Sequence, residues 1–542
     1  MRLNKNPLKE IPYNNFGGGY AGAKGASSLS ASEALDLDNI VVLPDGAGFK
    51  NRQANKFLSL VSGSISNTSD GILGLGTYKG ASNERLIWVV LDAGQTTDVS
   101  VLDTIIGTPG ATSRHTYTSS GATVNTIFTL FNFQSKVIGV GGRLAPFKVV
   151  PGTSGGALAG TPPNGTVGLS WNNRCWIGNT SANPSKLSYS ILNDPEDWSS
   201  SGSGFVEPSA GDGDEITAVV PIANNVLLLF KNRSIYQVVG RTDPFAVFPL
   251  FQNEGCVGKH AAVGAEGLVY FITPAGRMKI TDGNRIYDNK DIASLSNADD
   301  LWDQVPKTRL PYIQGFRQSG KSFDWIVWMV SYGSSQATNN YALIWDLKNK
   351  CWLKCSTGYN GNVAAKSSTE RYYIGDPAYP QVFELDYPSY YTDDSQGTFN
   401  NTTVSGSLYR PIAPTDPRAV RWYWRTDDIA LNSLENVVQV DRINVLTQYA
   451  GNGDIKLSYG YDGYHDIASV TKSIIPYTFL LGTSILGVDK LGGVQFSTET
   501  VRPLGRGNTF NCKIEGTTAI GSSVTKYTLS GRQAATKVKE VR

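Results

Sequence analysis

Short apolar runs alternate with turn-forming residues from about residue 70 onward, and this alternation constrains the fold more than any other feature of the sequence. The runs are rich in Val, Ile, Leu, Phe, Tyr and Trp, and clusters of Gly, Asn, Asp and Pro separate them. The first group of residues favours strands and the second favours turns. Few segments have a helical period, so we predict an all-β chain of antiparallel hairpins and meanders.

The strand pattern recurs with a loose period of about 40 to 50 residues, which is typical of propeller blades. Ile216–Gly240 predicts a three-stranded meander, and the pattern returns at Ala261–Tyr287, Ser322–Cys355 and Ala364–Asp386. One such unit cannot bury both of its faces, whereas radial stacking covers the faces and leaves only short edges. We therefore predict a β-propeller of about six to eight blades.

The pattern changes after Asp386. Residues 391–407 are polar and predict a connection, and the segments beyond them predict longer, strongly alternating strands of a β-sandwich or similar sheet domain. The N-terminal residues are rich in Gly, Ser and Ala, which permits an arm that reaches a neighbour. The predicted division is an N-terminal arm or first strands at 1–40, a β-propeller at 41–400 and a C-terminal β-sandwich-like domain at 401–542.

The composition bounds the partners and the compartment. The 542 residues include 58 glycines and 26 tyrosines but 3 methionines, which favours turns and sheets. With 48 basic and 46 acidic residues the net charge is +2, so no global field would hold nucleic acid tightly by counterion release. The N-terminus is polar and no apolar run of about 18 residues occurs, so we expect neither a signal peptide nor a membrane span. The expected product is a soluble protein made in a cytoplasm.

The cysteines are too scattered for a disulfide framework. Cys351 and Cys355 stand four apart in a predicted strand, which separates them by about 13 Å, too far to form a bridge or share a zinc ion. We predict that all five are buried thiols: Cys175, Cys256, Cys351, Cys355 and Cys512.

The histidines offer one weak candidate for an ion site. His115, His260 and His465 are far apart in the sequence, but His465 lies near Asp462 and Asp466. These three side chains could join an oxygen-rich ion site. A solvated loop histidine is the simpler interpretation.

The segment Gly315–Ser322 (GFRQSGKS) matches the phosphate-loop pattern G-x-x-x-x-G-K-[S/T]. A phosphate loop needs a helix after it, because the helix N-terminus supplies amides to the phosphates. Here the next residues, Phe323–Val330, are aromatic and β-branched and predict a strand. We therefore interpret the segment as a β-hairpin turn rather than a nucleotide site.

Two acidic clusters could supply the pair of carboxyls that a glycosidase places about 5 to 10 Å apart across a cleft. Both occur among Asn, Pro and Gly residues, so turn capping by Asp is the simpler interpretation. The clusters are Asp194, Glu196 and Asp197, and Asp212, Asp214 and Glu215. We predict no catalytic, cofactor-binding or metal-binding residue, no cofactor and no enzymatic activity.

Near the N-terminus the chain has Phe16–Gly19 (FGGG) and then SSLSASEALDLDNI over Ser27–Ile40. These segments resemble the start of phage tail and head-completion proteins, which follows the pattern F-x-GG…L…E-A-x-D-x-x-N. A turn at Asp45–Gly46 and a basic segment at Lys50–Arg52 follow. The family often has Arg-x-Gly at this last point, where this chain has Arg52–Ala54 (RQA).

The most specific match lies further along the chain. Trp171–Trp176 (WNNRCW), Asn183–Ser190 (NPSKLSYS) and Asp194–Trp198 (DPEDW) resemble the "NRLW…P-x-x-L-x-x-S…DPEDW" blade of the same family. The matched segments span about residues 16 to 290, with weaker similarity to the end. The family is the tail tubular protein B, nozzle and packaged-DNA stabilisation group of short-tailed phages.

The resemblance implies a structural virion protein of the phage tail. Such proteins form rings, usually homo-hexamers, below the portal and the adaptor, or head-tail connector. The ring would extend the DNA ejection channel, retain packaged DNA and dock tail fibres or a needle. The implied partners are other copies of the chain, the adaptor, fibres or needle, and DNA that passes without sequence-specific binding. The implied location is the virion tail, assembled in the host cytoplasm, without membrane insertion.

Two alternatives use the same fold, because fold does not fix function. The first is a tail-associated receptor-binding or glycan-degrading propeller, which would need a carboxylate pair in a cleft. The second is an interaction scaffold of cellular origin.

Overall fold

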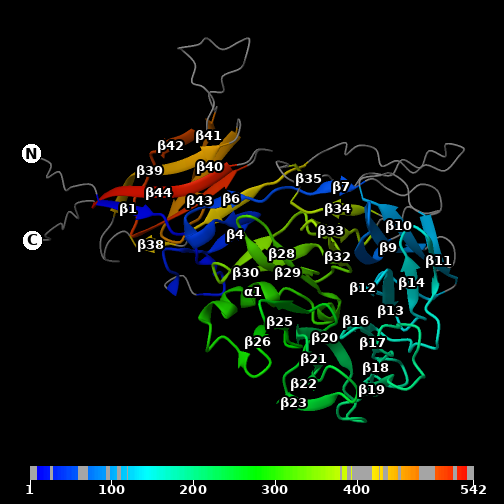
Figure 1. Ribbon diagram of the computed structural model, residues 1–542. Coiled ribbons are helices and arrows are strands. Elements are labelled where there is room, and N and C mark those ends of the chain that lie inside the picture. The colour runs from blue at the N-terminus through cyan, green and yellow to red at the C-terminus, as the bar shows by residue number, and fades with distance from the viewer. Residues whose placement is uncertain are drawn as a thin grey trace, which may run out of the picture.

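The computed structural model describes residues 9–24, 28–58, 71–92, 98–106, 112–118, 120–378, 381–386, 392–393, 418–426, 428–430, 438–449, 453–474, 495–516 and 522–533. Strands dominate these residues, and the α-helical part is one short helix, α1 (Asp299–Trp302). The strands form two bodies (Figure 1). One is a ring of four-stranded sheets, and the other is a two-sheet sandwich beside it.

The ring contains seven sheets within the described residues, and we call them blades 1 to 7 in chain order. Blade 1 has β8 (Ile72–Lys79), β9 (Glu84–Asp92), β10 (Asp98–Ile105) and β11 (Thr112–Tyr117); blade 2 has β12 (Phe128–Phe133), β13 (Lys136–Gly141), β14 (Phe147–Val150) and β15 (Ser154–Ala157); blade 3 has β16 (Val167–Trp171), β17 (Arg174–Gly178), β18 (Leu187–Tyr189) and β19 (Gly204–Val206). Blade 4 has β20 (Ile216–Ala223), β21 (Val226–Lys231), β22 (Ser234–Val239) and β23 (Ala246–Gln252); blade 5 has β24 (Ala262–Ala265), β25 (Leu268–Ile272), β26 (Met278–Thr281) and β27 (Ile286–Tyr287).

The last two blades take strands from the N-terminal region. Blade 6 has β28 (Gln314–Ser319), β29 (Asp324–Val330), β30 (Tyr341–Asp346) and β31 (Cys351–Cys355), followed at its outer edge by β2 (Gly19–Tyr20) and β3 (Glu33–Ala34). Blade 7 has β32 (Val363–Lys366), β33 (Tyr372–Gly375), β34 (Val382–Glu384) and, outermost, β7 (Lys56–Leu58). The first strand of each blade contacts the first strand of the next, and β32 contacts β8, so the ring is closed. The predicted β-propeller is confirmed.

Turn chemistry accounts for the hairpins within the blades. Asn172 and Asn173 join β16 to β17 with φ of 51° and 53°, and Trp171 pairs with Arg174 across the turn. Glu266 and Gly267 join β24 to β25 in the same way, with φ of 54° and 78°. Two-residue loops of this kind match the twist of the flanking strands, and Asn and Gly tolerate positive φ.

The sandwich has one sheet in the order β42-β39-β44-β6-β5, with β1 also paired to β44, and a second in the order β4-β37-β43-β40-β41, with β38 paired to β43. Its N-terminal strands are β1 (Lys9–Tyr13), β4 (Asp36–Asp38), β5 (Ile40–Val42) and β6 (Phe49–Asn51). Its C-terminal strands are β37 (Trp422–Arg425), β38 (Ile429–Ala430), β39 (Val438–Tyr449), β40 (Gly453–Tyr461), β41 (Ala468–Ile474), β42 (Gln495–Val501), β43 (Thr509–Gly516) and β44 (Ser522–Gln533).

Aromatic side chains from both ends of the chain fill the sandwich core. Phe49 stacks on Trp424 with ring centroids 5.4 Å apart, and Phe16 meets Trp424 edge-on at 5.3 Å. Tyr13 stacks on Tyr527 at 4.5 Å. All five are buried, so neither end could form this core without the other.

The predicted domain boundaries are therefore wrong at the N-terminal side. Residues 41–58 were assigned to the propeller, but β5 and β6 belong to the sandwich and only β7 joins a blade. The sandwich is not built from 401–542 alone, because β1, β4 and β6 pair with its C-terminal strands and β5 extends the sheet by pairing with β6. The predicted connection at 391–407 lies outside the described residues, apart from β35 (Thr392–Asp393), which pairs with β36 (Arg418–Ala419).

Candidate functional site at the mouth of the propeller channel

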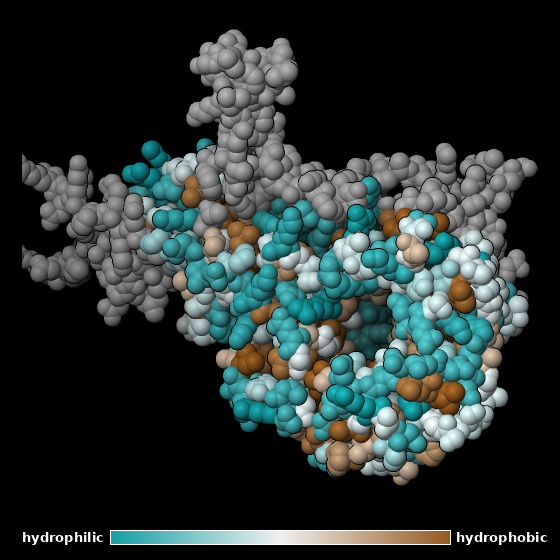
Figure 2. All heavy atoms as spheres, in the orientation of Figure 1, coloured by the Kyte–Doolittle hydropathy of each residue, from teal (hydrophilic) through white to brown (hydrophobic). Residues whose placement is uncertain are grey.

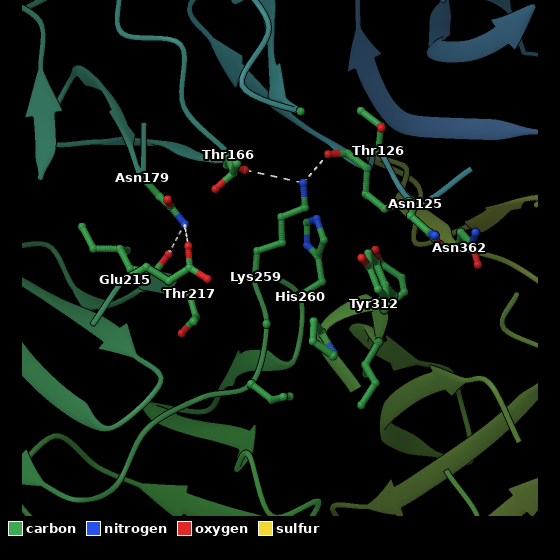
Figure 3. A pocket seen from close by; sticks show the side chains of 18 of the residues that line it. Asn125, Thr126, Thr166, Asn179, Glu215, Thr217, Lys259, His260, Tyr312 and Asn362 are labelled. Carbon is green, nitrogen blue, oxygen red and sulfur yellow. Dashed lines mark hydrogen bonds between the residues drawn. The ribbon is translucent and has the colours of Figure 1, made fainter. Parts of the chain in front are cut away.

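A pocket of about 330 Å³ opens where the first strands of the blades begin, around the centre of the ring. Figure 2 shows this hollow as a hydrophilic depression in the face turned toward the viewer. Its walls come from the segments that lead into the first strands of blades 2 to 7, and from Gly142, Arg143 and Asn179, which follow the second strands of blades 2 and 3. The residues labelled in Figure 3 line it: Asn125, Thr126, Thr166, Asn179, Glu215, Thr217, Lys259, His260, Tyr312 and Asn362.

Lys259 reaches across the mouth from the segment before β24 of blade 5. Its Nζ donates to the carbonyl of Ile127, just before β12, and to the carbonyl of Thr166, 3.5 Å away and just before β16 (Figure 3). Burial lowers the pKa of Lys259 to about 7. The side chain therefore ties blade 5 to blades 2 and 3.

His260 makes a second connection between blades 5 and 2. Its Nε2 lies 3.2 Å from the Thr129 hydroxyl of β12, and its carbonyl accepts from Gly315 N of β28 at 2.7 Å. Burial, and then the charge of Lys259, lower the pKa of His260 to about 3. The ring is therefore neutral near pH 7, where it can share a hydrogen bond with Thr129 but does not take up a proton.

Glu215 and Asn179 connect blades 2, 3 and 4 on the opposite wall. Asn179 Nδ2 donates to Glu215 Oε2 at 3.2 Å and to the carbonyl of Ile216 at 2.8 Å, and its Oδ1 accepts from Arg143 at 3.2 Å. Arg143 also lies 3.5 Å from Glu215, with both side chains more than 40% exposed. The amide bonds hold this wall together, whereas an ion pair this exposed adds little.

Asn362 and Arg309 complete the circle. Asn362 accepts from Asn339 N at 3.2 Å and donates to the Val124 carbonyl at 3.4 Å. Arg309 donates to Asn125 Oδ1 at 2.8 Å and lies over the Tyr312 ring. Most of these polar groups thus bond to another blade, several of them across the channel, so the contacts hold the blades of the propeller together. Lys259 and its role were not predicted from the sequence. The sequence feature that could have indicated it is Gly258-Lys259-His260, where two polar side chains directly precede an apolar strand.

The first acidic cluster caps turns and joins two blades. Asp194 Oδ1 accepts from Glu196 N at 2.9 Å, and Asp197 Oδ1 accepts from Ser200 N at 3.0 Å. Glu196 instead accepts from Lys136 at 2.8 Å and from Lys148, both in blade 2. Burial alone would raise the pKa of Glu196, but these two lysines lower it to about 2.

The Asp residues of the second acidic cluster also cap turns, since Asp212 Oδ1 accepts from Asp214 N at 2.9 Å. Asp212 accepts from Lys231 Nζ at 2.8 Å, and Asp214 accepts from Asn232 N at 3.1 Å. Turn capping is confirmed for the Asp residues of both clusters, while Glu215 lies at the channel mouth.

The hairpin interpretation of Gly315–Ser322 is confirmed. Gly315 to Ser319 lie in β28, Gly320 N donates to the Phe323 carbonyl at 2.9 Å, and β29 follows at once. The backbone turns directly into an antiparallel strand, so no helix N-terminus faces the loop. Ser322 accepts from Lys50 Nζ at 3.0 Å, a contact between the blade and the sandwich strand β6.

The structure places the five cysteines and two further histidines, His115 and His465, outside any cluster of described side chains that could bind a metal ion. All five cysteines are buried and none is in a disulfide, which confirms the prediction of buried thiols. His115 packs against the Tyr117 ring in β11, and burial lowers its pKa. His465 lies exposed in the turn between β40 and β41, while Asp462 accepts backbone amides and Asp466 pairs with Arg425 at 2.5 Å. Among the described residues, no group of three or more His, Cys, Asp or Glu side chains could hold a metal ion.

Solved structures of other proteins match about three fifths of this chain at low sequence identity. YCF48 from Cyanidioschyzon merolae is 9% identical, with a TM-score of 0.38 over 61% of this chain and 98% of its own. BamB from Moraxella catarrhalis is 11% identical, with a TM-score of 0.37 over 62% of this chain and 100% of its own. The WD40 β-propeller domain of Doa1 is 11% identical, with a TM-score of 0.36 over 60% of this chain and 97% of its own. No protein-family model and no curated protein matches the sequence.

The fold is a β-propeller with an added sandwich. At such identities the likeness concerns architecture alone. Within the described part of the chain, no helix is long and apolar enough to cross a membrane.

Proposed function

We propose that this chain is a structural subunit of a phage tail, a nozzle-like ring component that lines the DNA ejection path and docks other tail proteins. The proposal begins from the resemblance of Trp171–Trp198 to the blade of that family. The structure adds one observation that supports the proposal. The residues that carry the resemblance build blade 3 of the propeller and its contacts with blade 2.

Several residues of the matched segments stabilise the turns and connections of blade 3. Asn172 and Asn173 make the tight turn of its first hairpin. The buried Arg174 donates to the Ser190 carbonyl at 2.8 Å and to the Gly202 carbonyl, which fixes the long connection after β18. Ser190 Oγ accepts from Cys175 N at 3.0 Å, and Glu196 binds the lysines of blade 2. A motif whose turn, arginine and glutamate hold blade 3 together and tie it to blade 2 supports a scaffold.

The channel of a single propeller is not the proposed path for DNA. Its pocket of about 330 Å³ has the size of a small-molecule site, far below that of duplex DNA, and polar ties between blades cross it. A DNA path must therefore lie between subunits of a ring. The net charge of +2 suits such a path, because each basic contact with a phosphate would add salt-dependent friction.

Electron microscopy of the purified full-length chain, and of particles that contain it, tests the proposal. We expect closed rings of one symmetry, and the same ring below the portal in particles. A monodisperse monomer at high concentration, without association with particles, would overturn it. Steady release of oligosaccharides from a host polysaccharide would instead favour the glycan-degrading alternative.

A further inference from the structure

Lys259 brings a positive charge to the pocket at the channel mouth, and no described carboxylate pairs with it. Part of its side-chain surface is open, but the amine lies deep enough that burial lowers its pKa to about 7. Burial is the cause of this shift, and no Asp or Glu of the described residues offsets it. An ammonium in such a place is costly unless an anion pairs with it, so the pocket favours a negatively charged ligand.

The amine also keeps a hydrogen-bond donor for that ligand. An ammonium group has three N–H donors. Two of them are directed at the carbonyls of Ile127 and Thr166, the second over a long 3.5 Å (Figure 3). No described residue accepts the third donor. A ligand can therefore bind Lys259 while the contacts between the blades stay in place.

The other charged groups that line the pocket do not cancel the charge of Lys259. Among the described lining residues the one carboxylate is Glu215, which already lies 3.5 Å from Arg143 and accepts from Asn179 at 3.2 Å. His260 is neutral near pH 7, because its pKa is about 3. One positive charge therefore remains unbalanced in the pocket.

Three uncharged polar groups of the pocket are free to bind the rest of a ligand. They are the Thr166 hydroxyl, the Tyr312 hydroxyl and Asn125 Nδ2, and they form no hydrogen bond with another described residue (Figure 3). Arg309 lies behind this wall, where it donates to Asn125 Oδ1 at 2.8 Å and lies over the Tyr312 ring. This cation holds the wall and adds to the positive potential without lining the pocket. Hydroxyl and amide groups held in this way suit the hydroxyls of a ligand.

We propose that the pocket binds a small hydroxylated carboxylate, such as a sugar acid, with the carboxylate at Lys259 and the hydroxyls at the three free polar groups. The volume of about 330 Å³ is at the small end of ligand sites, which fits an acid of this size. The single unbalanced ammonium favours one negative charge over the two of a phosphate group. The site lies inside one propeller and does not depend on the ring proposed above.

Calorimetric titration of the full-length chain at about pH 6.5, where the amine is mostly charged, tests the proposal. The probes are glucuronate, gluconate and lactate, which combine a carboxylate with one or more hydroxyls. Glucose is the matched control without a carboxylate, and inorganic phosphate is the matched anion without a carbon skeleton. We expect saturable binding of at least one of the acids, and binding of glucose and phosphate that is weaker by roughly tenfold or more.

Substitutions in the pocket separate binding from folding. Lys259→Met removes the charge and should weaken binding by roughly tenfold or more. Because Lys259 also connects blades, Thr166→Val and Tyr312→Phe provide a second test. Each removes one free hydroxyl, leaves the carbonyl contacts of Lys259 in place, and should weaken binding about threefold to tenfold. Lys290→Met replaces an exposed lysine outside the pocket and should bind like the wild type.

Proton uptake gives a readout that a purely structural lysine would not change. At about pH 8 most of the Lys259 amine is neutral, and an anion bound beside it raises its pKa, so the complex takes up a proton. The measured enthalpy should then vary with the ionisation enthalpy of the buffer. It should not vary at about pH 5.5, where the amine is already charged, or in Lys259→Met. His260, with a pKa of about 3, stays neutral over this range.

Three results would overturn the proposal. The first is no saturable binding of any of the three acids below about 10 mM. The second is binding of glucose or phosphate as tight as that of the acids. The third is binding that Lys259→Met leaves unchanged. None of these results bears on ring assembly, which electron microscopy measures separately.

Discussion

The propeller and the sandwich are both all-β, but they pair their strands differently along the sequence. Blades 1 to 5 are built from consecutive strands, so each sheet forms from one short stretch of sequence. The sandwich pairs strands from the two ends, as when Lys9 of β1 meets Gly531 of β44. Local pairing makes the propeller a series of similar units, whereas the sandwich exists only when both ends have arrived. The two bodies should therefore respond differently to the same kind of damage.

The largest effect expected is in the sandwich core. Trp424→Ala removes the indole that packs on Phe49 and Phe16, and should cost about 3 to 5 kcal/mol of sandwich stability. Trp176→Ala makes the same change within blade 3. Hydrogen exchange of each variant should show loss of protection confined to its own body. Equal loss in both bodies for either variant would show that they unfold as one unit.

A pH-dependent effect comes next, at the channel mouth. The pKa of His260 is about 3 in the folded protein, below its unfolded value of about 6.5, so the unfolded chain binds more protons between these values. The contribution of neutral His260 to the free energy of unfolding is therefore fully present above about pH 6.5 and is lost as the pH falls below that value. From pH 7 to pH 5 the wild type should lose about 1 to 2 kcal/mol more than His260→Asn. Denaturant titrations at the two pH values measure this, with the exposed His465→Asn as the control that should follow the wild type.

A smaller effect is expected between blades 2 and 3. Glu196→Gln keeps the shape of the side chain but removes the charge that Lys136 and Lys148 bind, and should lower stability by about 1 kcal/mol at pH 7. Because the pKa of Glu196 is lowered to about 2, the difference should shrink as the pH falls from about 4.3 toward 2. Thermal melts of both proteins across that range give the comparison. A difference that grows at low pH would contradict the assigned ion pairs.

The smallest effect is expected for Arg143→Ala. Its pair with Glu215 is long and exposed, so the loss should stay below about 0.5 kcal/mol. Asn179→Ala, which also removes the bonds to Glu215 and Ile216, is the matched comparison and should cost about 1 to 3 kcal/mol. Chemical denaturation separates the two. If Arg143→Ala is the more damaging change, the wall depends on the ion pair rather than the amide.

Local sequence signals predicted most of the propeller because its contacts are local. The Ile216–Gly240 meander, the Glu266-Gly267 turn and the hairpin at Gly320 occur where turn chemistry places them. The pairing of β1 and β6 with β44 was not predicted. Alternation of apolar and polar residues predicts that a strand exists, but it does not indicate which distant strand it pairs with. The channel mouth was missed for the same reason. Lys259, Thr166 and Ile127 meet only because ring closure brings three blades together.

Native mass spectrometry of the full-length chain over a range of concentrations tests the central proposal most directly. The account predicts one dominant oligomer with the stoichiometry of a closed ring, which persists on dilution. A monomer at all concentrations, or a ladder of sizes without a preferred one, would contradict it.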